Sequence, residues 1–127
     1  KKINQIIDMQ KKKTGKLFNF CLYSVGVIAN KNKKEKKYLS DLGEEIGLLF
    51  QLADDFLDKK GTKHLVGKPV KKDNKKGKST LLKLMGDKKA FLYANNLKKN
   101  ILRKLVKHGK KAEDLINTIN FIFERKY

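Results

Sequence analysis

The spacing of apolar residues between Leu39 and Leu57 is the feature that most constrains the fold. Apolar side chains recur three and four positions apart along this segment, which is the period of one face of an α-helix. They are Leu39, Leu42, Ile46, Leu49, Phe50, Ala53, Phe56 and Leu57. Gly43 and Gly47 lie four residues apart in the same segment and leave room for a second helix to approach closely. We therefore expect a long, central and mostly buried helix.

The other segments share this helical period. Apolar residues keep it in residues 3–9, in a short segment ending at Met85, in residues 87–108 and from residue 111 onward. Ser79 and Asp87 are the predicted N-caps of the two helices on either side of Gly86. No segment alternates with a period of two, so the sequence predicts an all-α fold.

Residues 17–29 are apolar on almost every side, which is typical of a buried helix. Cys21 lies within this segment, and we expect it to be a small buried thiol and not a nucleophile. Gly15 precedes the segment and can relax or interrupt the helical backbone there.

We expect the central helix to end with an acidic cluster, which follows its apolar stripe. Gln51, Asp54, Asp55 and Asp58 fall on one helical face. Asp54 and Asp58 are like charges at i and i+4, an arrangement that disfavours a helix by roughly 0.2–0.5 kcal/mol. A divalent cation would remove this repulsion, and Mg²⁺ suits carboxylate oxygens combined with phosphates and waters. The alternative is a solvated acidic helix end balanced by neighbouring lysines.

The large positive net charge does not by itself identify the type of binding partner. The 127 residues carry a formal charge of +19, which ordinarily points to nucleic acid, an anionic membrane or a phosphorylated substrate. The lysines are spread over almost every segment, and the only arginines are Arg103 and Arg125. Base-edge recognition relies on arginine. We therefore expect no nucleic-acid partner.

The cysteine content and the hydropathy limit the expected cellular location and exclude some types of site. One cysteine excludes an internal disulfide framework and a multi-cysteine zinc site, which favours a cytoplasmic location. No run of about 18 uncharged apolar residues exists, so no stable membrane anchor is expected. His64 and His108 are isolated, and we expect both to be surface residues.

A long cationic segment follows the acidic cluster. Residues 61–78 have little apolar periodicity and include Lys68 beside the single proline, Pro69. Loops of this length in compact domains are usually functional or disordered. Its lysines could hold the far side of a metal-bound phosphate.

Three motifs in this order resemble the C-terminal half of the trans-isoprenyl diphosphate synthases. They are Lys13-Thr14-Gly15, the acidic stretch from Phe50 to Asp58, and the run Gly67-Lys68, Asp73, Gly77-Lys78-Ser79-Thr80. Within that family, the motifs most resemble those of the bacterial farnesyl and geranyl diphosphate synthases. The resemblance covers nearly the whole chain. It implies an antiparallel helical bundle of the isoprenoid synthase type.

The resemblance also implies roles for individual residues. Asp54 would ligate Mg²⁺, with Mn²⁺ as the alternative ion, while Asp55 and Asp58 would act through waters or as further ligands. Gln51 would hydrogen-bond near the diphosphate. Lys13 and Lys68 would contact the allylic diphosphate, and Thr14 would position Lys13.

The implied reaction condenses isopentenyl diphosphate with dimethylallyl or geranyl diphosphate in a homodimeric enzyme. The family's first aspartate-rich motif, however, is absent from these residues. We therefore expect residues 1–127 to be the C-terminal part of a single isoprenoid synthase domain and to be inactive alone. The alternatives are a non-catalytic or regulatory subunit of such a synthase, or a basic helical module that binds nucleic acid or an anionic membrane.

Overall fold

The structure is a computed structural model that describes residues 2–64 and 80–124, with side chains omitted at residues 60–64. Every element in these ranges is helical, which confirms the all-α prediction for this part of the chain. In order, the elements are α1 (Ile3–Gln10), the π-helix η1 (Lys11–Gly15), α2 (Lys16–Ile28), α3 (Lys33–His64), α4 (Leu81–Met85), α5 (Asp87–Val106), the 3₁₀-helix η2 (Gly109–Ala112) and α6 (Glu113–Glu124).

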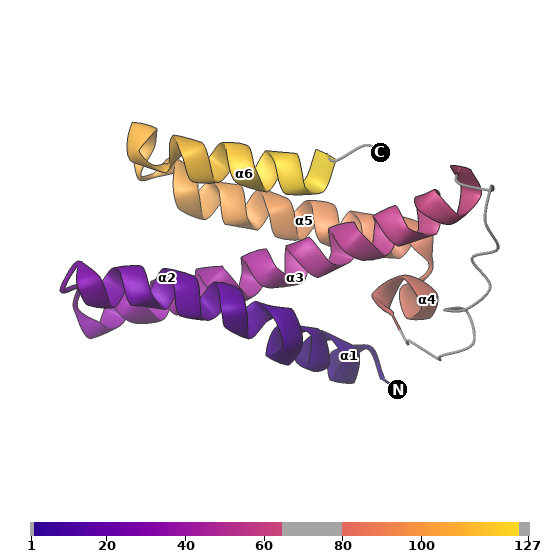
Figure 1. Cartoon of the computed structure of the whole chain (residues 1–127), viewed down its shortest axis with the longest axis horizontal. Coiled ribbons are helices and arrows are strands. Elements are labelled where there is room, and N and C mark those ends of the chain that lie inside the picture. Colours follow the sequence, from indigo (N-terminus) through magenta and orange to yellow (C-terminus); the bar gives the residue numbers. More distant parts are fainter. Residues whose placement is uncertain (1, 65–79, 125–127) are drawn as a thin grey trace.

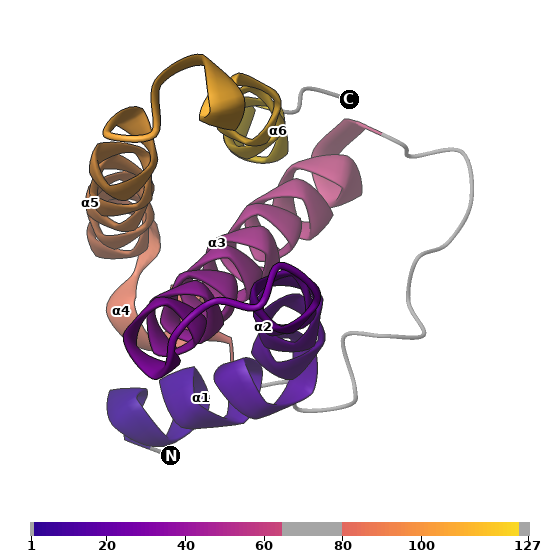
Figure 2. The same ribbon diagram turned by 90° about the vertical axis from the view of Figure 1, so that its left-hand side faces the viewer.

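Helix α3 is the centre of the arrangement. Helices α1, η1 and α2 follow one another without a break and bend between α1 and α2 (Figures 1 and 2). This bent helical segment, which we call the rod, packs on α3, whereas α5 and α6 pack together on another side of α3. The short helix α4 contacts α1, α3 and α5. Among the described residues, the rod makes no direct contact with α5 or α6, and α3 and α4 lie between them.

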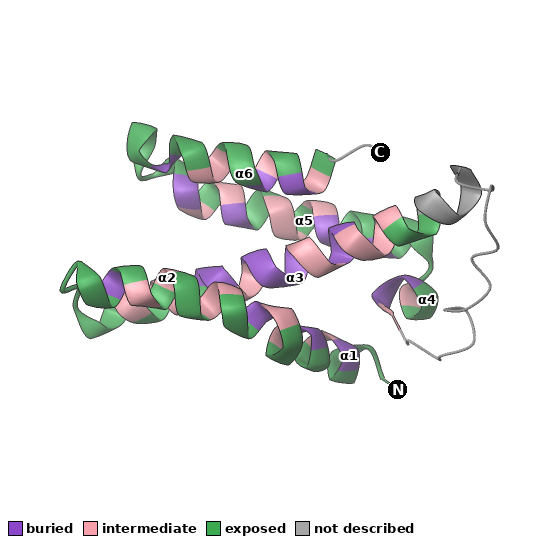
Figure 3. Ribbon diagram, in the orientation of Figure 1, coloured by how far each residue is buried: buried purple, intermediate pink, exposed green. Residues whose placement is uncertain are grey.

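The hydrophobic core gathers along α3 (Figure 3). Leu49 and Leu52 of α3 are fully buried, and their neighbours in the core come from α1, α4, α5 and α6. The largest fully buried side chains are Ile6, Leu42, Leu48, Leu49, Leu52, Leu81, Ile101 and Ile119. The prediction of a long, central, buried helix is confirmed.

Two glycines set how closely the rod approaches α3. A Cβ atom at Gly47 would lie 2.6 Å from the Cα of Gly15, and one at Gly43 would lie 2.5 Å from the carbonyl oxygen of Phe18. Both separations are too short for any side chain, so backbone meets backbone at this crossing. The predicted close approach of a second helix at Gly43 and Gly47 is confirmed.

Helix α2 differs from the prediction. Phe20 is 66% exposed and Ile28 is 85% exposed, and Gly26 is the buried residue of this helix. Cys21 is exposed as well, so the expected buried thiol is wrong. The reason is that α2 packs on α3 through one face, and no other α-helix in the described ranges covers its remaining faces.

The helix ends near Gly86 also differ in detail. The N-cap of α4 is Thr80, whose hydroxyl oxygen accepts a hydrogen bond from the Lys83 backbone at 3.3 Å. The predicted cap Ser79 lies outside the described residues. Gly86 ends α4 with φ of 75° and is itself the N-cap of α5, so Asp87 is the first residue of that helix and not its cap.

No helix among the described residues has both the length and the apolar content needed to cross a membrane.

Replacing Gly47 with alanine should destabilise the protein by about 1–3 kcal/mol, because the new methyl group would be forced into the Gly15 backbone. Gly15→Ala is the matched control at the same crossing, since its Cβ would find neighbours no nearer than 3.6 Å. Urea unfolding of both variants measures the difference. Equal stabilities would contradict the backbone contact.

Candidate functional site

The acidic cluster lies within α3 and not at its end. Asp54, Asp55 and Gln51 are half-buried, and Asp58 is exposed. Helix α3 continues to His64, so the expectation that the helix ends with the cluster is wrong. The like charges therefore meet on a continuous helical surface, where their mutual repulsion cannot be relieved by fraying.

The rod runs antiparallel to α3 and brings the Lys-Thr motif to the acidic face. The Nε2 atom of Gln10 donates a hydrogen bond to Oδ2 of Asp55 at 3.3 Å, and further along the rod Gly15 lies against Gly47. Residues 13 and 14 lie between these two contacts. The register thus places them beside the part of α3 that carries Gln51.

The Lys-Thr motif sits in a turn of π-helix, which is wider than an α-helical turn and often occurs at functional sites. Lys13 is exposed and Thr14 is half-buried, and neither side chain forms a hydrogen bond or ion pair within the described ranges. Lys12, by contrast, pairs with Asp8 at 2.8 Å. The hydrogen bond and the charge of Asp8 raise the pKa of Lys12. A ligand can therefore engage Lys13 without breaking an ion pair of the described residues, which is not true of Lys12.

The donor chemistry of the acidic face fits Mg²⁺ only as part of a coordination shell. Carboxylate oxygens are the ligands that this ion prefers, and it is commonly held by one or two of them together with phosphate oxygens and waters. Among residues 2–64 and 80–124, no group of three or more His, Cys, Asp or Glu side chains is arranged to hold a metal ion. A ligand carrying phosphate would have to complete the shell.

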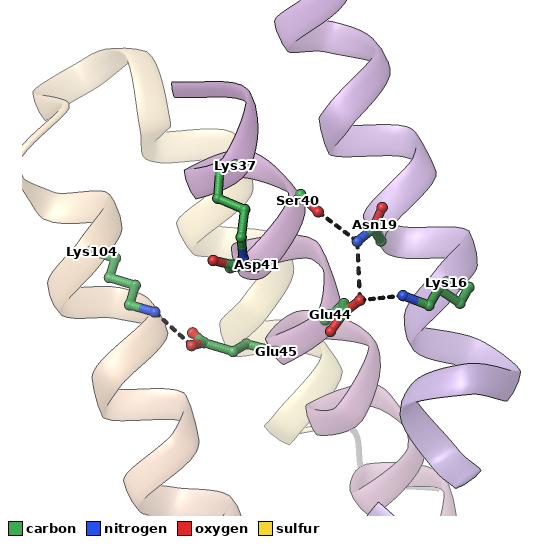
Figure 4. Close-up of polar contacts among 8 residues, drawn as sticks. All are labelled: Lys16, Asn19, Lys37, Ser40, Asp41, Glu44, Glu45 and Lys104. Atoms are coloured by element: carbon green, nitrogen blue, oxygen red, sulfur yellow. Dashed lines mark hydrogen bonds and ion pairs between the residues drawn. The ribbon is translucent and has the colours of Figure 1, made fainter. Parts of the chain in front are cut away.

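Two adjacent glutamates tie both neighbours to α3 (Figure 4). Oε1 of Glu44 accepts hydrogen bonds from Lys16 at 2.6 Å and from Asn19 at 3.1 Å, and Asn19 also donates to Ser40 at 2.7 Å. Glu45 points to the other side and receives Lys104 of α5 at 2.6 Å. These contacts fix the rod and α5 on α3 just before the acidic face begins.

A separate hollow of about 360 Å³ lies beside Glu45 and is lined by Asn100, Arg103 and Lys104 of α5 and by Lys107, the residue that follows this helix. Burial, and next the charge of Glu45, raise the pKa of nearby Tyr93. Glu45 precedes Asp54 by nine residues, or about 13 Å along the helix. The hollow is therefore distinct from the acidic face, which we take as the candidate site because the Lys-Thr motif converges on it.

Two further residues singled out in the sequence, Lys68 and His108, do not belong to the described part of the acidic face. Lys68 lies outside the described residues, so its role as a diphosphate ligand stays a prediction. His108 is exposed, as expected, and its Nε2 lies 3.4 Å from the Tyr38 hydroxyl.

Sequence reasoning missed Gln10. Its side chain is 5% exposed and it contacts the acidic face directly. The signal was present, because Gln10 continues the helical stripe formed by Ile3, Ile6 and Ile7. A polar residue in such a stripe is expected to need a buried partner.

A model of the polyprenyl synthetase family matches residues 1–121. The chain belongs to this family. The resemblance found in the motifs is thus confirmed, and the described helices agree with the all-α fold expected of the family.

Curated members of the polyprenyl synthetase family are similar over much of the chain. A farnesyl diphosphate synthase of Micrococcus luteus is 36% identical over 66% of the chain and 29% of its own length. A geranylgeranyl diphosphate synthase of Sulfolobus acidocaldarius is 31% identical over 99% of the chain and 37% of its own length. A dimethylallyltranstransferase of Fischerella ambigua is 32% identical over 91% of the chain and 33% of its own length.

The chain therefore spans about a third of the length of the curated relatives it matches. No solved structure matches it at the significance threshold of the comparison.

Replacing Glu44 with alanine should lower the free energy of unfolding by about 1 kcal/mol, because Lys16 and Asn19 of the rod both lose their acceptor. The matched control is Asp41→Ala, three residues earlier on α3, where an exposed carboxylate pairs only with Lys37 of the same helix. Its expected effect is within about 0.5 kcal/mol. Thermal unfolding compares the two, and equal losses would refute a specific role for Glu44.

Proposed function

We propose that this chain forms the wall of a prenyl diphosphate synthase that carries the second aspartate-rich motif. The enzyme would condense isopentenyl diphosphate with dimethylallyl or geranyl diphosphate to give geranyl or farnesyl diphosphate. The observation that carries the proposal is the register of the rod on α3, with Gln10 against Asp55 and Gly15 against Gly47. This register sets the Lys-Thr turn beside the acidic face. The names of the relatives support the same chemistry.

The acidic residues of this face would bind the cation, and the basic and polar residues beside it would bind the diphosphate. Asp54, Asp55 and Asp58 would hold Mg²⁺, or Mn²⁺ in its place, with the diphosphate completing the shell. The bound ion would offset the negative charge that develops on the departing diphosphate. Lys13 would place a mobile ammonium group on the same diphosphate, with Thr14 positioning it and Gln51 hydrogen-bonding nearby.

The reaction replaces the diphosphate on the allylic carbon, and the negative charge that builds up on the departing diphosphate has to be stabilised. The allylic carbon–oxygen bond breaks and its electron pair leaves with the diphosphate. The double bond of isopentenyl diphosphate then attacks the allylic carbon, and loss of a proton restores neutrality. Ammonium donors on the leaving oxygen lower the barrier most where water is excluded. The half-buried aromatic pair Phe18 and Phe50, with ring centroids 5.6 Å apart, supplies apolar surface between the rod and α3.

Activity would require more than this wall. We propose that residues 1–127 are the C-terminal part of a single isoprenoid synthase domain, which agrees with the share of the relatives' length that they match. Lys68 would add a second ammonium group to the diphosphate. The chain alone would be inactive, and the full enzyme would be a cytoplasmic homodimer.

Asp54→Asn in the full-length protein should lower prenyl-transfer turnover by about 100-fold or more, the size expected when one group that stabilises transition-state charge is lost. Asparagine keeps the shape but removes the charge that would hold the cation. Helical content measured by circular dichroism should not change. The product is measured by incorporation of labelled isopentenyl diphosphate.

The matched control is Asp41→Asn on the same helix, where the carboxylate is exposed and pairs with Lys37. Its turnover should stay within about twofold of the unmodified protein, as expected for a surface substitution. Near-normal turnover of Asp54→Asn would argue against the proposed function. Equal losses in both variants would assign the effect to helix stability instead.

A further inference from the structure

Gln10 is an unusual residue in the described part of the chain. It is the one polar residue among the buried side chains there, at 5% exposure. It comes from α1, the helix before the Lys-Thr turn, and it reaches across to α3. Most buried polar side-chain atoms have at least one hydrogen-bond partner, because an unpaired polar atom is costly away from water.

Only the nitrogen of the Gln10 side-chain amide has a hydrogen-bond partner among the described residues. Nε2 donates to Oδ2 of Asp55 at 3.3 Å, whereas Oε1 is buried and has no hydrogen-bond partner among the described residues. Reversing the amide would not help, since it would place the carbonyl oxygen against the carboxylate oxygen. The Asp55 contact therefore fixes the amide in the orientation that leaves the buried carbonyl oxygen without a partner among the described residues.

This arrangement costs folding free energy. A buried acceptor without a partner destabilises the folded state, whereas an apolar side chain of similar shape would avoid this cost. The position continues a stripe of isoleucines, so an apolar residue suits the local packing. A glutamine at this position is therefore better explained by its hydrogen bond to Asp55 than by packing.

We infer that Gln10 is a positioning residue for the cation and diphosphate site. This inference rests on the proposed function. The amide nitrogen donates to the Asp55 carboxylate and so fixes its orientation on the face that would bind the hydrated cation. Partners that orient metal-binding carboxylates typically change metal affinity 10–100-fold when they are removed.

The same residue also ties the site to the rod. Gln10 immediately precedes the π-turn, and the Gln10–Asp55 and Gly15–Gly47 contacts bracket Lys13 and Thr14 on opposite sides. Anchoring one end of the turn to the acidic face limits how far Lys13 can move from that face. Occupation of the cation site and the placement of Lys13 are thereby coupled through one side chain.

The test replaces Gln10 with methionine, which has a similar length and no hydrogen-bonding amide. In the full-length protein, thermal unfolding is followed while MgCl₂ is titrated at a fixed concentration of inorganic diphosphate. We expect the Mg²⁺ concentration at half-maximal stabilisation to rise about tenfold. Without Mg²⁺, the unfolding temperature should be unchanged or higher, because the unpaired acceptor is gone.

Gln5→Met is the matched control, because Gln5 is an exposed glutamine of the same helix whose Oε1 accepts from the Lys2 backbone. It should leave the Mg²⁺ midpoint unchanged. Gln10→Leu provides a second apolar variant that reports the same quantity if the methionine variant does not fold.

The outcomes separate this inference from the proposed function. If the unmodified protein is stabilised by Mg²⁺ with diphosphate and a folded Gln10 variant has the same midpoint, the role of Gln10 is overturned while the proposed function stands. A purely structural role would lower the unfolding temperature without moving the midpoint. If the unmodified protein shows no Mg²⁺-dependent stabilisation, both proposals are overturned.

Discussion

The contact between the backbones of Gly15 and Gly47 is the constraint on which the arrangement depends. At this point the rod lies so close to α3 that no side chain fits between the two backbones. The contact therefore fixes which residues of the rod lie opposite which residues of α3. On one side of the crossing the rod places Gln10 on Asp55, and on the other side it places Asn19 within hydrogen-bonding distance of Ser40 and Glu44. A larger residue at the crossing would displace all of these contacts together, because packed helices transmit strain.

Helix α3 serves as a shared wall for two layers. Glu44 binds the rod and Glu45 binds α5, so two consecutive carboxylates point to opposite sides of one helix. Core residues such as Leu49 and Leu52 fill the interior beneath them. The acidic face comes about two turns later on the same rigid helix. Functional groups mounted on a helix that is packed on both sides are held more precisely than groups on a loop.

The sequence was informative where a repeating pattern carried the information. The period of the apolar residues predicted the helices, and the spacing of Gly43 and Gly47 predicted the close crossing. It misled where burial depended on which other helices are present. The apolar character of residues 17–29 suggested a buried helix, yet Phe20 and Cys21 are exposed because α2 has one packed face in the described fold.

The sequence by itself determined the helical class, the position of the acidic face and the family, because these depend on local spacing and on ordered motifs. Only the tertiary structure decided that the Lys-Thr turn is a π-helix set beside that face, and that Gln10 is buried against Asp55. The physical reason is that both features arise from contacts between residues more than 30 positions apart, whose register is fixed by packing and cannot be read from either segment alone.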